Sequence, residues 1–407
     1  MDYLQRFKEI YSDLLVFSRE KIPLCAAETY VSPFCKQALS SEFEGKYIQG
    51  YKKRIIDKDN IGSDKIYQLL SLVENICSDI YGAKYVDSRT LSGMNCMATL
   101  VMALIDKKST VAITTKEMGG HPSLASILEN LGINYIPIPY DFNALQIDYK
   151  KLNILIEKTN ISFLIFCQSD IINPPNLSEI ILPQNTGIIY DASQTLGLIA
   201  AKELDNPLLQ NDKVILIGGT HKTLPGPTCG LIMTNQQEYI DKIDYAISPT
   251  LLRNIQPNNI ASLCLALIEQ QKCGREYQRS IVCNANKLGG YLEEEKIKVI
   301  HISPITYSKT HQLFLCFDED TTDRIFSRAL YHNITLNKRK SKLYTGIRIG
   351  VQEISRYGYT DSDLRAIAKL IHLLSDPNTS NKEILDICLY LRTKKDPMYI
   401  LDDIFME

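Results

Sequence analysis

The stretch "KVILIGGTHKTLPGP" (213–227) joins a near-continuous apolar run to a single lysine that follows two glycines and a histidine. The apolar run is typical of a strand that is buried on both faces of a sheet. A lysine at the carboxyl end of a buried strand is costly to remove from water. Lys222 therefore needs either a carboxylate partner or a chemical use for a neutral amine.

Strands of the same kind alternate with helical segments along the chain. The predicted strands are "TVAITT" (110–115), "INYIPIPY" (133–140), "SFLIFCQ" (162–168), "GIIYDAS" (187–193) and "GLIMTN" (230–235). This alternation predicts an α/β fold with a mostly parallel sheet that helices cover on both faces. After about residue 252 the pattern turns helical, and short strands with a helix at 321–331 then predict a smaller α+β domain.

The composition bounds the class of protein. The chain has 407 residues, of which 45% are hydrophobic, and a formal net charge of −2, so two domains are expected and nucleic acid is not favoured as a partner. No run of 18 apolar residues occurs and the start does not resemble a signal peptide, so no membrane partner is expected. Eleven cysteines without a CxxC pair predict reduced thiols in a cytoplasmic protein. Six histidines without an HxxxH motif predict no metal site.

Polar residues gather where the predicted strands end, which is where α/β sheets bind ligands. These stretches are "SGMN" (92–95), "GGH" (119–121), "QSD" (168–170), "DASQ" (191–194) and "THK" (220–222). No GxGxxG motif follows the first strand, which argues against a dinucleotide site.

Together the strand ends supply a lysine, a carboxylate and a histidine, the parts that a pyridoxal phosphate (PLP) enzyme needs. Their order and spacing resemble the serine hydroxymethyltransferases, within the fold-type-I PLP enzymes. The best matched pieces are "KYIQGY" (46–51), "GGH" (119–121), "DASQTLGLIAA" (191–201), "THKTLPGPTCGLI" (220–232), "HQLFL" (311–315) and "GIRIG" (346–350). The resemblance implies PLP as cofactor, an amino-acid substrate, and an aspartate aminotransferase-like large domain with a seven-stranded sheet.

The resemblance also implies a domain plan. Residues 1–35 form an N-terminal helix and arm, residues 36–270 the large PLP-binding domain, and residues 271–407 the smaller C-terminal domain. The residues after 375 are expected to add one or two helices to the smaller domain.

Each site residue takes its role from its place in the family's motifs. Lys222 is implied to bond the cofactor, Asp191 to keep its pyridine nitrogen protonated, and His121 to stack on its ring. Arg348 is implied to grip the substrate α-carboxylate as a planar fork. The other implied cofactor-binding residues are Ser92, Gly93, Met94, Ser169, Gln194 and His221, and the other substrate-binding residues are Tyr47, Gln49 and Ala27. Tyr47 would come from the partner chain, which implies a homodimer with shared active sites.

Several positions depart from the family's pattern. Ala27 replaces a serine, Met94 replaces the second serine of the phosphate cup, and Gln49 replaces the glutamate that acts as acid–base in the folate-dependent reaction. An amide does not exchange a proton usefully near neutral pH. The segment that corresponds to the family's glycine-rich loop is "SPTLLRN" (248–254), which has no glycine. The segment "NKRKSKLY" (337–344) is shorter than the family's folate-contacting loop. The sequence therefore predicts PLP chemistry without tetrahydrofolate.

The leading hypothesis is an aldolase or transaldolase that makes or breaks the Cα–Cβ bond of a β-hydroxy-α-amino acid of the serine, threonine and glycine class. Three alternatives stay open: a folate-dependent glycine hydroxymethyltransferase, another PLP reaction such as transamination, decarboxylation, racemisation or oxidation, and a scaffold without activity. The basic run of Lys338, Arg339, Lys340 and Lys342 suggests either a site for an anionic acceptor or a carrier protein, or a solvated loop, and the loop is favoured.

Overall fold

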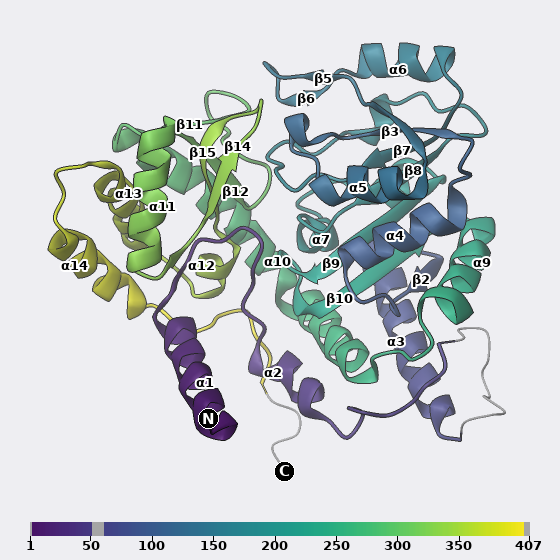
Figure 1. The fold of residues 1–407 in the computed structure, drawn as a ribbon, viewed down its shortest axis with the longest axis horizontal. Helices are drawn as coiled ribbons and strands as arrows, with labels where there is room; N and C mark the ends of the chain where they lie inside the picture. The colour runs from purple at the N-terminus through teal and green to yellow at the C-terminus, as the bar shows by residue number, and fades with distance from the viewer. Residues whose placement is uncertain (1, 51–60, 403–407) are drawn as a thin grey trace. The chain divides into compact units, whose positions relative to one another are not determined.

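The computed structural model describes residues 2–50 and 61–402. The chain divides into two compact units (Figure 1). The larger unit contains Ala27–Arg279 and Tyr399–Glu407, and the smaller unit contains Met1–Ala26 and Ser280–Met398. The predicted domain boundary at residue 270 falls inside the long helix α10 (Pro257–Glu294), which contributes residues to both units.

A seven-stranded sheet forms the centre of the larger unit. Its strands, in spatial order, are β2 (Tyr85–Asp87), β10 (Pro225–Thr234), β9 (Val214–His221), β8 (Gly187–Asp191), β7 (Ile161–Phe166), β3 (Thr110–Ile113) and β4 (Asn134–Pro137). The five strands from β9 to β4 are parallel, whereas β10 runs antiparallel to both β9 and β2. The predicted α/β fold with a mostly parallel seven-stranded sheet is confirmed.

Helices cover both faces of this sheet (Figure 1). One face packs against α3 (Ser63–Tyr81), α6 (Tyr149–Lys158), α7 (Leu196–Ala200), α8 (Pro207–Gln210) and α10; the other packs against α4 (Gly93–Leu104), α5 (Pro122–Leu131) and α9 (Gln237–Tyr245). Successive strand residues such as Leu216 and Ile217 point to opposite faces and are both fully buried. This explains why the strands read as unbroken apolar runs.

Short elements connect these layers. They are α2 (Pro33–Lys36), the hairpin β5 (Tyr140–Asp141) and β6 (Gln146–Ile147), and the helical turns η1 (Gln37–Ser40), η2 (Lys116–Met118), η3 (Leu177–Glu179) and η4 (Ala246–Leu251).

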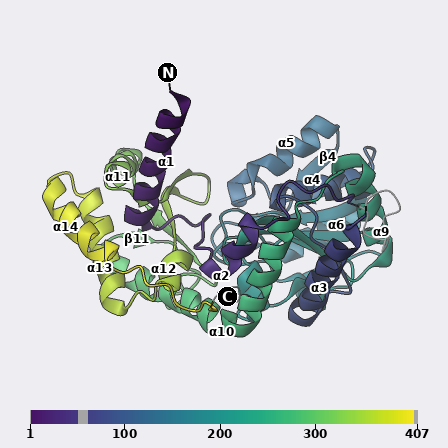
Figure 2. The same cartoon turned by 90° about the horizontal axis from the view of Figure 1, so that it is seen from below.

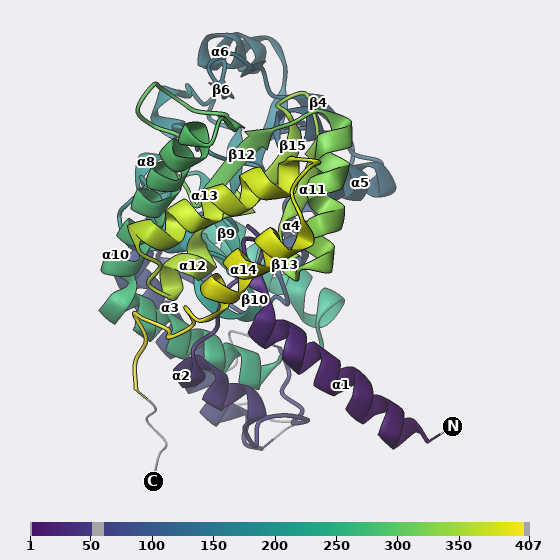
Figure 3. The same ribbon diagram turned by 90° about the vertical axis from the view of Figure 1, so that its left-hand side faces the viewer.

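The smaller unit is built on an antiparallel sheet. Its strands, in order, are β11 (Lys298–Val299), β12 (Gln312–Cys316), β15 (Thr345–Gly350) and β14 (Asn337–Lys340), and β1 (Ile22–Pro23) pairs separately with β13 (Ile334–Thr335). Its helices are α1 (Tyr3–Glu20), α11 (Glu319–Tyr331), α12 (Gln352–Arg356), α13 (Asp361–Ser375) and α14 (Asn381–Arg392). Helix α13 contacts both α11 and α14, and Figure 3 shows these two helices beside it. The predicted smaller α+β domain is confirmed.

Helix α1 is amphipathic and has no buried residue, so its apolar side chains face solvent in the single chain. It projects from its unit as a separate rod (Figure 2). Asp2 caps its first turn by accepting from the backbone N–H groups of Leu4 and Gln5. Within residues 2–50 and 61–402 no helix is long and apolar enough to cross a membrane.

Three residues of the basic run, Lys338, Arg339 and Lys340, belong to a strand, β14, whereas Lys342 lies in the bend after it. Lys338 pairs with Asp323 and Lys340 with Glu319, both acids of α11. The favoured prediction of a solvated loop is therefore wrong in its secondary structure for residues 338–340. Alternate residues of a strand share one face, so two of the positive charges lie against the acidic helix.

Candidate functional site

Three neighbouring parallel strands of the larger unit end in polar residues. Lys222 follows β9 directly and is half-buried, Asp191 is the last residue of β8, and Cys167 follows β7. Because adjacent parallel strands end at the same edge, the predicted lysine and carboxylate lie at one edge of the sheet.

Hydrogen bonds fix both oxygens of the Asp191 carboxylate. Its Oδ1 accepts from the backbone N of Ser193 at 2.8 Å and from the Ser193 hydroxyl at 2.5 Å. Its Oδ2 accepts from the Cys167 thiol at 3.2 Å. Burial, and then the Asp191 charge, raise the pKa of the Cys167 thiol well above its ordinary value. Cys167 thus keeps its proton and donates it to the carboxylate.

Ser193 ties the end of β8 to the end of β9. Its Oγ also accepts from the backbone N of Gly219 at 2.8 Å. A Cβ added at Gly93 would lie 2.5 Å from the Ser193 Oγ and 2.9 Å from the Gly219 N. The first turn of α4 therefore lies directly against the Asp191–Ser193 loop, and only glycine fits there.

The start of α4 is the predicted phosphate cup. Ser92 caps this helix, its Oγ accepting from the Asn95 N at 3.2 Å, and Gly93 and Met94 form the first turn. The free backbone N–H groups and the helix dipole of a 12-residue helix attract an anion. The bulky side chain of Met94 is half-buried in this turn.

His121 is held at the next strand end. It caps α5 through its Nδ1, which accepts from the Ser123 N at 3.2 Å, and its own backbone N donates to the Cys167 carbonyl at 2.7 Å. A Cβ at Gly120 would lie 2.1 Å from the Thr114 carbonyl oxygen. The glycines of the "GGH" motif thus allow the close approach that brings His121 beside the end of β7.

Three further predicted cofactor residues lie at the same edge. Ser169 is half-buried and donates its backbone N–H to the Gly119 carbonyl at 2.8 Å. Gln194 is buried, and its carbonyl accepts from the Thr223 hydroxyl at 3.0 Å. Burial, and then the nearby Lys222 charge, lower the pKa of His221 below its ordinary value, so its imidazole stays neutral at pH 7.

Arg348 belongs to the smaller unit, where β15 carries it with 2% of its surface exposed. Its cross-strand neighbour Asn337 accepts from the guanidinium at two nitrogens, Nε at 3.1 Å and Nη2 at 2.7 Å. The orientation of the fork is therefore fixed by a neutral amide. The structure assigns Ala27, which is half-buried, to the larger unit.

Tyr47 and Gln49 lie on a segment that crosses residues 253–255. Gln49 forms an antiparallel bridge with Asn254 and is 8% exposed, whereas Tyr47 is 50% exposed. The Ile48 N donates to the Asn254 Oδ1 at 2.8 Å, and the Tyr67 hydroxyl donates to the Gln49 carbonyl at 3.1 Å. Asn254, the last residue of the predicted loop at 248–254, thus anchors the segment that carries Tyr47 and Gln49.

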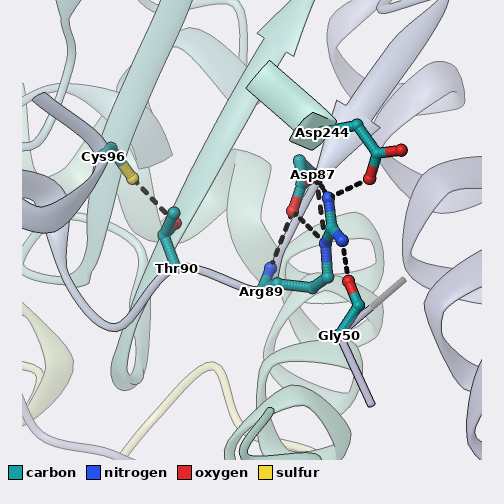
Figure 4. Close-up of polar contacts among 6 residues, drawn as sticks. All are labelled: Gly50, Asp87, Arg89, Thr90, Cys96 and Asp244. Carbon is teal, nitrogen blue, oxygen red and sulfur yellow. Dashed lines mark hydrogen bonds and ion pairs between the residues drawn. The ribbon is translucent and has the colours of Figure 1, made fainter. Parts of the chain in front are cut away.

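Sequence reasoning missed a buried charge cluster that holds the same segment (Figure 4). Arg89, 2% exposed, donates to the Gly50 carbonyl and pairs with Asp87 and with Asp244, the latter at 2.7 Å. Burial alone would lower the pKa of Arg89, but the two carboxylates raise it. Its only signal in the sequence is an arginine directly after a short strand, which is too common to single out.

A hollow of about 850 Å³ opens between α3 and α9, beside the Arg89 cluster, and shares Tyr67 and Asp244 with the contacts just described. Its walls are formed by Asp64, Tyr67, Gln68, Leu70, Ser71, Leu72, Glu74, Asn75, Tyr85, Gln237, Ile240, Asp241 and Asp244. None of the predicted site residues lines it. Within residues 2–50 and 61–402, no group of three or more histidine, cysteine, aspartate or glutamate residues is placed to hold a metal ion.

Comparisons with known proteins assign the family. The model of the family described as serine hydroxymethyltransferase matches residues 5–371. A serine hydroxymethyltransferase of Sulfolobus acidocaldarius is 29% identical, with 90% of this chain and 86% of that protein covered. One of Thermoplasma volcanium is 28% identical over 90% of both chains.

A solved structure shares the fold. The L-threonine transaldolase from Pseudomonas fluorescens superposes with a TM-score of 0.88 at 23% identity, covering 99% of this chain and 97% of that one. With the family model spanning most of the chain, these findings confirm the resemblance that the motifs gave. The chain belongs to the serine hydroxymethyltransferase family of PLP-dependent enzymes, which act on amino acids.

Proposed function

We propose that the protein is a PLP-dependent aldolase or transaldolase that works on a β-hydroxy-α-amino acid without tetrahydrofolate. The observation that carries the proposal is Gln49, an amide where the family has its acid–base glutamate. Lys222, Asp191 and Arg348 are all retained. The residues implied to bind the cofactor and the substrate carboxylate are thus retained, whereas the acid–base residue of the folate-dependent reaction is replaced.

The strand-end residues fit PLP. The carboxylate of Asp191 has both oxygens oriented, as a partner for a protonated pyridine nitrogen requires. Gly93 and Gly219 allow the N-terminus of α4, which is suited to a phosphate, to pack directly against the Asp191–Ser193 loop. Lys222 directly follows β9, at the strand end next to the one that carries Asp191.

When bound, PLP supplies an electron sink for the carbon next to the amino group of the substrate. In this proposal Lys222 binds the cofactor and yields it to the substrate amine, and Arg348 orients the substrate carboxylate. Breaking the Cα–Cβ bond of threonine gives glycine and acetaldehyde. The β-hydroxyl proton passes to a base, and Cα gains a proton.

His121 is the first candidate for that base. In a neutral imidazole whose Nδ1 accepts from the Ser123 N–H, the proton lies on Nε2. His121 therefore takes up the β-hydroxyl proton only after it breaks the hydrogen bond to Ser123. A retro-aldol step needs only a base and an electron sink, so the loss of the family's glutamate need not abolish it.

The structural likeness to an L-threonine transaldolase supports this reaction class. A homodimer with shared sites is also part of the proposal. The half-exposed Tyr47 supports it, because an aromatic side chain that serves a site in its own chain would be covered there.

The proposal is tested with the full chain loaded with PLP in folate-free buffer. Threonine is added, and acetaldehyde release is followed with a coupled NADH-dependent alcohol dehydrogenase. We expect aldehyde release that tetrahydrofolate does not stimulate and that Lys222→Ala abolishes. Cofactor binding without aldehyde from threonine or serine would reject the aldol reaction in favour of another PLP reaction. A protein that binds no PLP would be a scaffold.

A second candidate, a folate-dependent glycine hydroxymethyltransferase, is favoured by the names of the curated relatives, which cover about 90% of this chain. Folate-dependent exchange of the glycine α-proton in the wild type would favour it. In Gln49→Glu the family's acid–base carboxyl is restored. If the proposal holds, this variant gains such exchange relative to the wild type, whereas the threonine reaction does not depend on the change.

A further inference from the structure

Two buried glutamines of α10 lie behind the chain that carries Lys222. Gln278 is fully buried, and its Nε2 donates to the carbonyl oxygen of Thr223 at 2.7 Å. Thr223 is the residue next to Lys222, so this bond fixes the Thr223–Leu224 peptide, one residue beyond the lysine. Gln270, eight residues earlier on the same helix, is 5% exposed.

These side chains close a ring of hydrogen bonds. The Gln278 Nε2 also donates to the Gln270 Oε1 at 3.3 Å, and the Gln270 Nε2 donates to the Gly197 carbonyl at 3.3 Å. The Gly197 N then donates to the Thr223 Oγ1 at 3.2 Å. The ring therefore passes through Thr223, Gln278, Gln270 and Gly197 and returns to Thr223.

The ring is tightly packed around Gly197. A Cβ at this position would lie 2.4 Å from both the Gln278 Nε2 and the Thr223 carbonyl oxygen. Gly197 lies in α7, the short helix that follows the Asp191–Gln194 loop. The Thr223 hydroxyl reaches into the same loop by donating to the Gln194 carbonyl. The ring thus joins the chain after Lys222 to the chain after Asp191.

The bonds made by Gln278 have no replacement from water, because the side chain is 0% exposed. A buried carbonyl that loses its donor keeps the full cost of its removal from water, so the backbone that bears it is free to move toward another donor. Lys222 is a long, flexible side chain whose reach depends on the backbone that bears it. A displacement of the peptide at Thr223 therefore moves the lysine amine relative to the Asp191 carboxylate.

We propose that Gln278, supported by Gln270, is a positioning residue that sets the approach of the Lys222 amine relative to Asp191. This inference rests on the proposed function only in requiring that Lys222 bonds PLP. Gln278 does not touch the reacting atoms and acts through the Thr223 peptide.

The test uses the full PLP-loaded chain and the variant Gln278→Met, which keeps the length of the side chain and removes its donor. We measure the pH midpoint of the visible absorbance of the lysine-bound cofactor, and the rate at which added glycine displaces Lys222. The midpoint is expected to shift, and the rate to fall by up to about 100-fold, as for a displacement of about 1 Å. Half-saturation by glycine should stay within about threefold, because Arg348 is untouched.

Two further variants separate positioning from folding. Gln271→Met removes an exposed glutamine of the same helix and should match the wild type in both measurements. Gln278→Glu carries a buried carboxyl whose pKa is raised, so it donates again when protonated. Its displacement rate, relative to that of the wild type at the same pH, should therefore recover as the pH falls.

The proposal is overturned if folded Gln278→Met keeps the wild-type midpoint and rate, or if Gln278→Glu shows no recovery at low pH. If Gln278→Met does not fold, Gln270→Met is the deciding variant and should give the same changes at smaller size. A failure of the proposed function is recognised in the wild type. If reduction with borohydride leaves no cofactor attached to Lys222, the proposed function itself is wrong.

Discussion

The edge around Lys222 and the segment around Gln49 are both fixed by buried polar groups, but by different kinds. At the lysine edge the chain is held mainly by neutral donors, among them Ser193, Thr223 and Gln278. At the Gln49 segment the Gly50 carbonyl is held by Arg89, whose charge is balanced by Asp87 and Asp244.

Because the two regions are held by different kinds of group, substitutions in them should have different effects on activity and on stability. Removing one neutral buried donor costs about 1–3 kcal/mol, whereas removing one partner of a buried ion pair costs about 3–5 kcal/mol. Changes at the lysine edge should therefore leave a folded protein with altered chemistry. Changes in the Arg89 cluster should mainly lower the free energy of unfolding.

The largest effect on chemistry is expected for Lys222→Ala. Loss of the amine that bonds the cofactor should lower kcat by about 10³-fold or more while thermal stability is kept. Activity assays and thermal melts check this pair of results. Lys84→Ala, at an exposed lysine before β2, should keep full activity. If Lys222→Ala kept its activity, the lysine edge would not be where the chemistry takes place.

The largest effect on stability is expected for Arg89→Met. Because Asp87 and Asp244 lose their buried partner, the free energy of unfolding should fall by about 3–5 kcal/mol. Urea denaturation measures it. Arg365→Met, at an exposed arginine that pairs with Glu294, should unfold almost as the wild type does. Equal stability of the two variants would mean that the cluster does not anchor the segment.

Cys167→Ala tests a bond at the lysine edge that involves a charge. The thiol donates to Asp191, and a hydrogen bond to a charged group contributes about 1.5–3 kcal/mol, so stability should fall by that amount. Cys167→Ser keeps a donor and should lose less. If the serine variant is the less stable of the two in urea, the donor is not what matters at this position.

The smallest effect is expected for His221→Asn. Burial and Lys222 lower the folded-state pKa of His221, so between that value and about 6.5 the unfolded chain binds more protons. Wild-type stability should therefore fall as the pH drops from 7 to 5, and it should fall less in His221→Asn. His301→Asn, at an exposed histidine, should keep the wild-type pH dependence. Parallel curves for all three proteins would contradict the assigned shift.

The sequence was enough to predict the sheet and to place Lys222 and Asp191 at one edge of it. Apolar runs such as 213–219 and 187–190 carry the signal of strands buried on both faces. Asp191 directly follows the second run, and Lys222 comes three residues after the first. The direction of β10 was not predictable, because a buried apolar run looks the same in a parallel and in an antiparallel strand.

The buried contacts that hold the lysine edge and the Gln49 segment could not be predicted from the sequence. Gln278 meets Thr223 across 55 residues, and Arg89 meets Asp244 across 155 residues. Such partners carry no local periodicity, so only the folded chain reveals them. The strand at 337–340 was likewise not predictable, because the acidic partners of Lys338 and Lys340 lie on α11 and meet them only in the folded chain.

The most direct test of the account is to find which lysine bonds the cofactor. The full chain is incubated with PLP and reduced with borohydride, and the modified peptide is identified by mass spectrometry. One adduct is expected, on Lys222. An adduct on another lysine, or none with a folded protein, would contradict the assignment of Lys222 as the cofactor lysine.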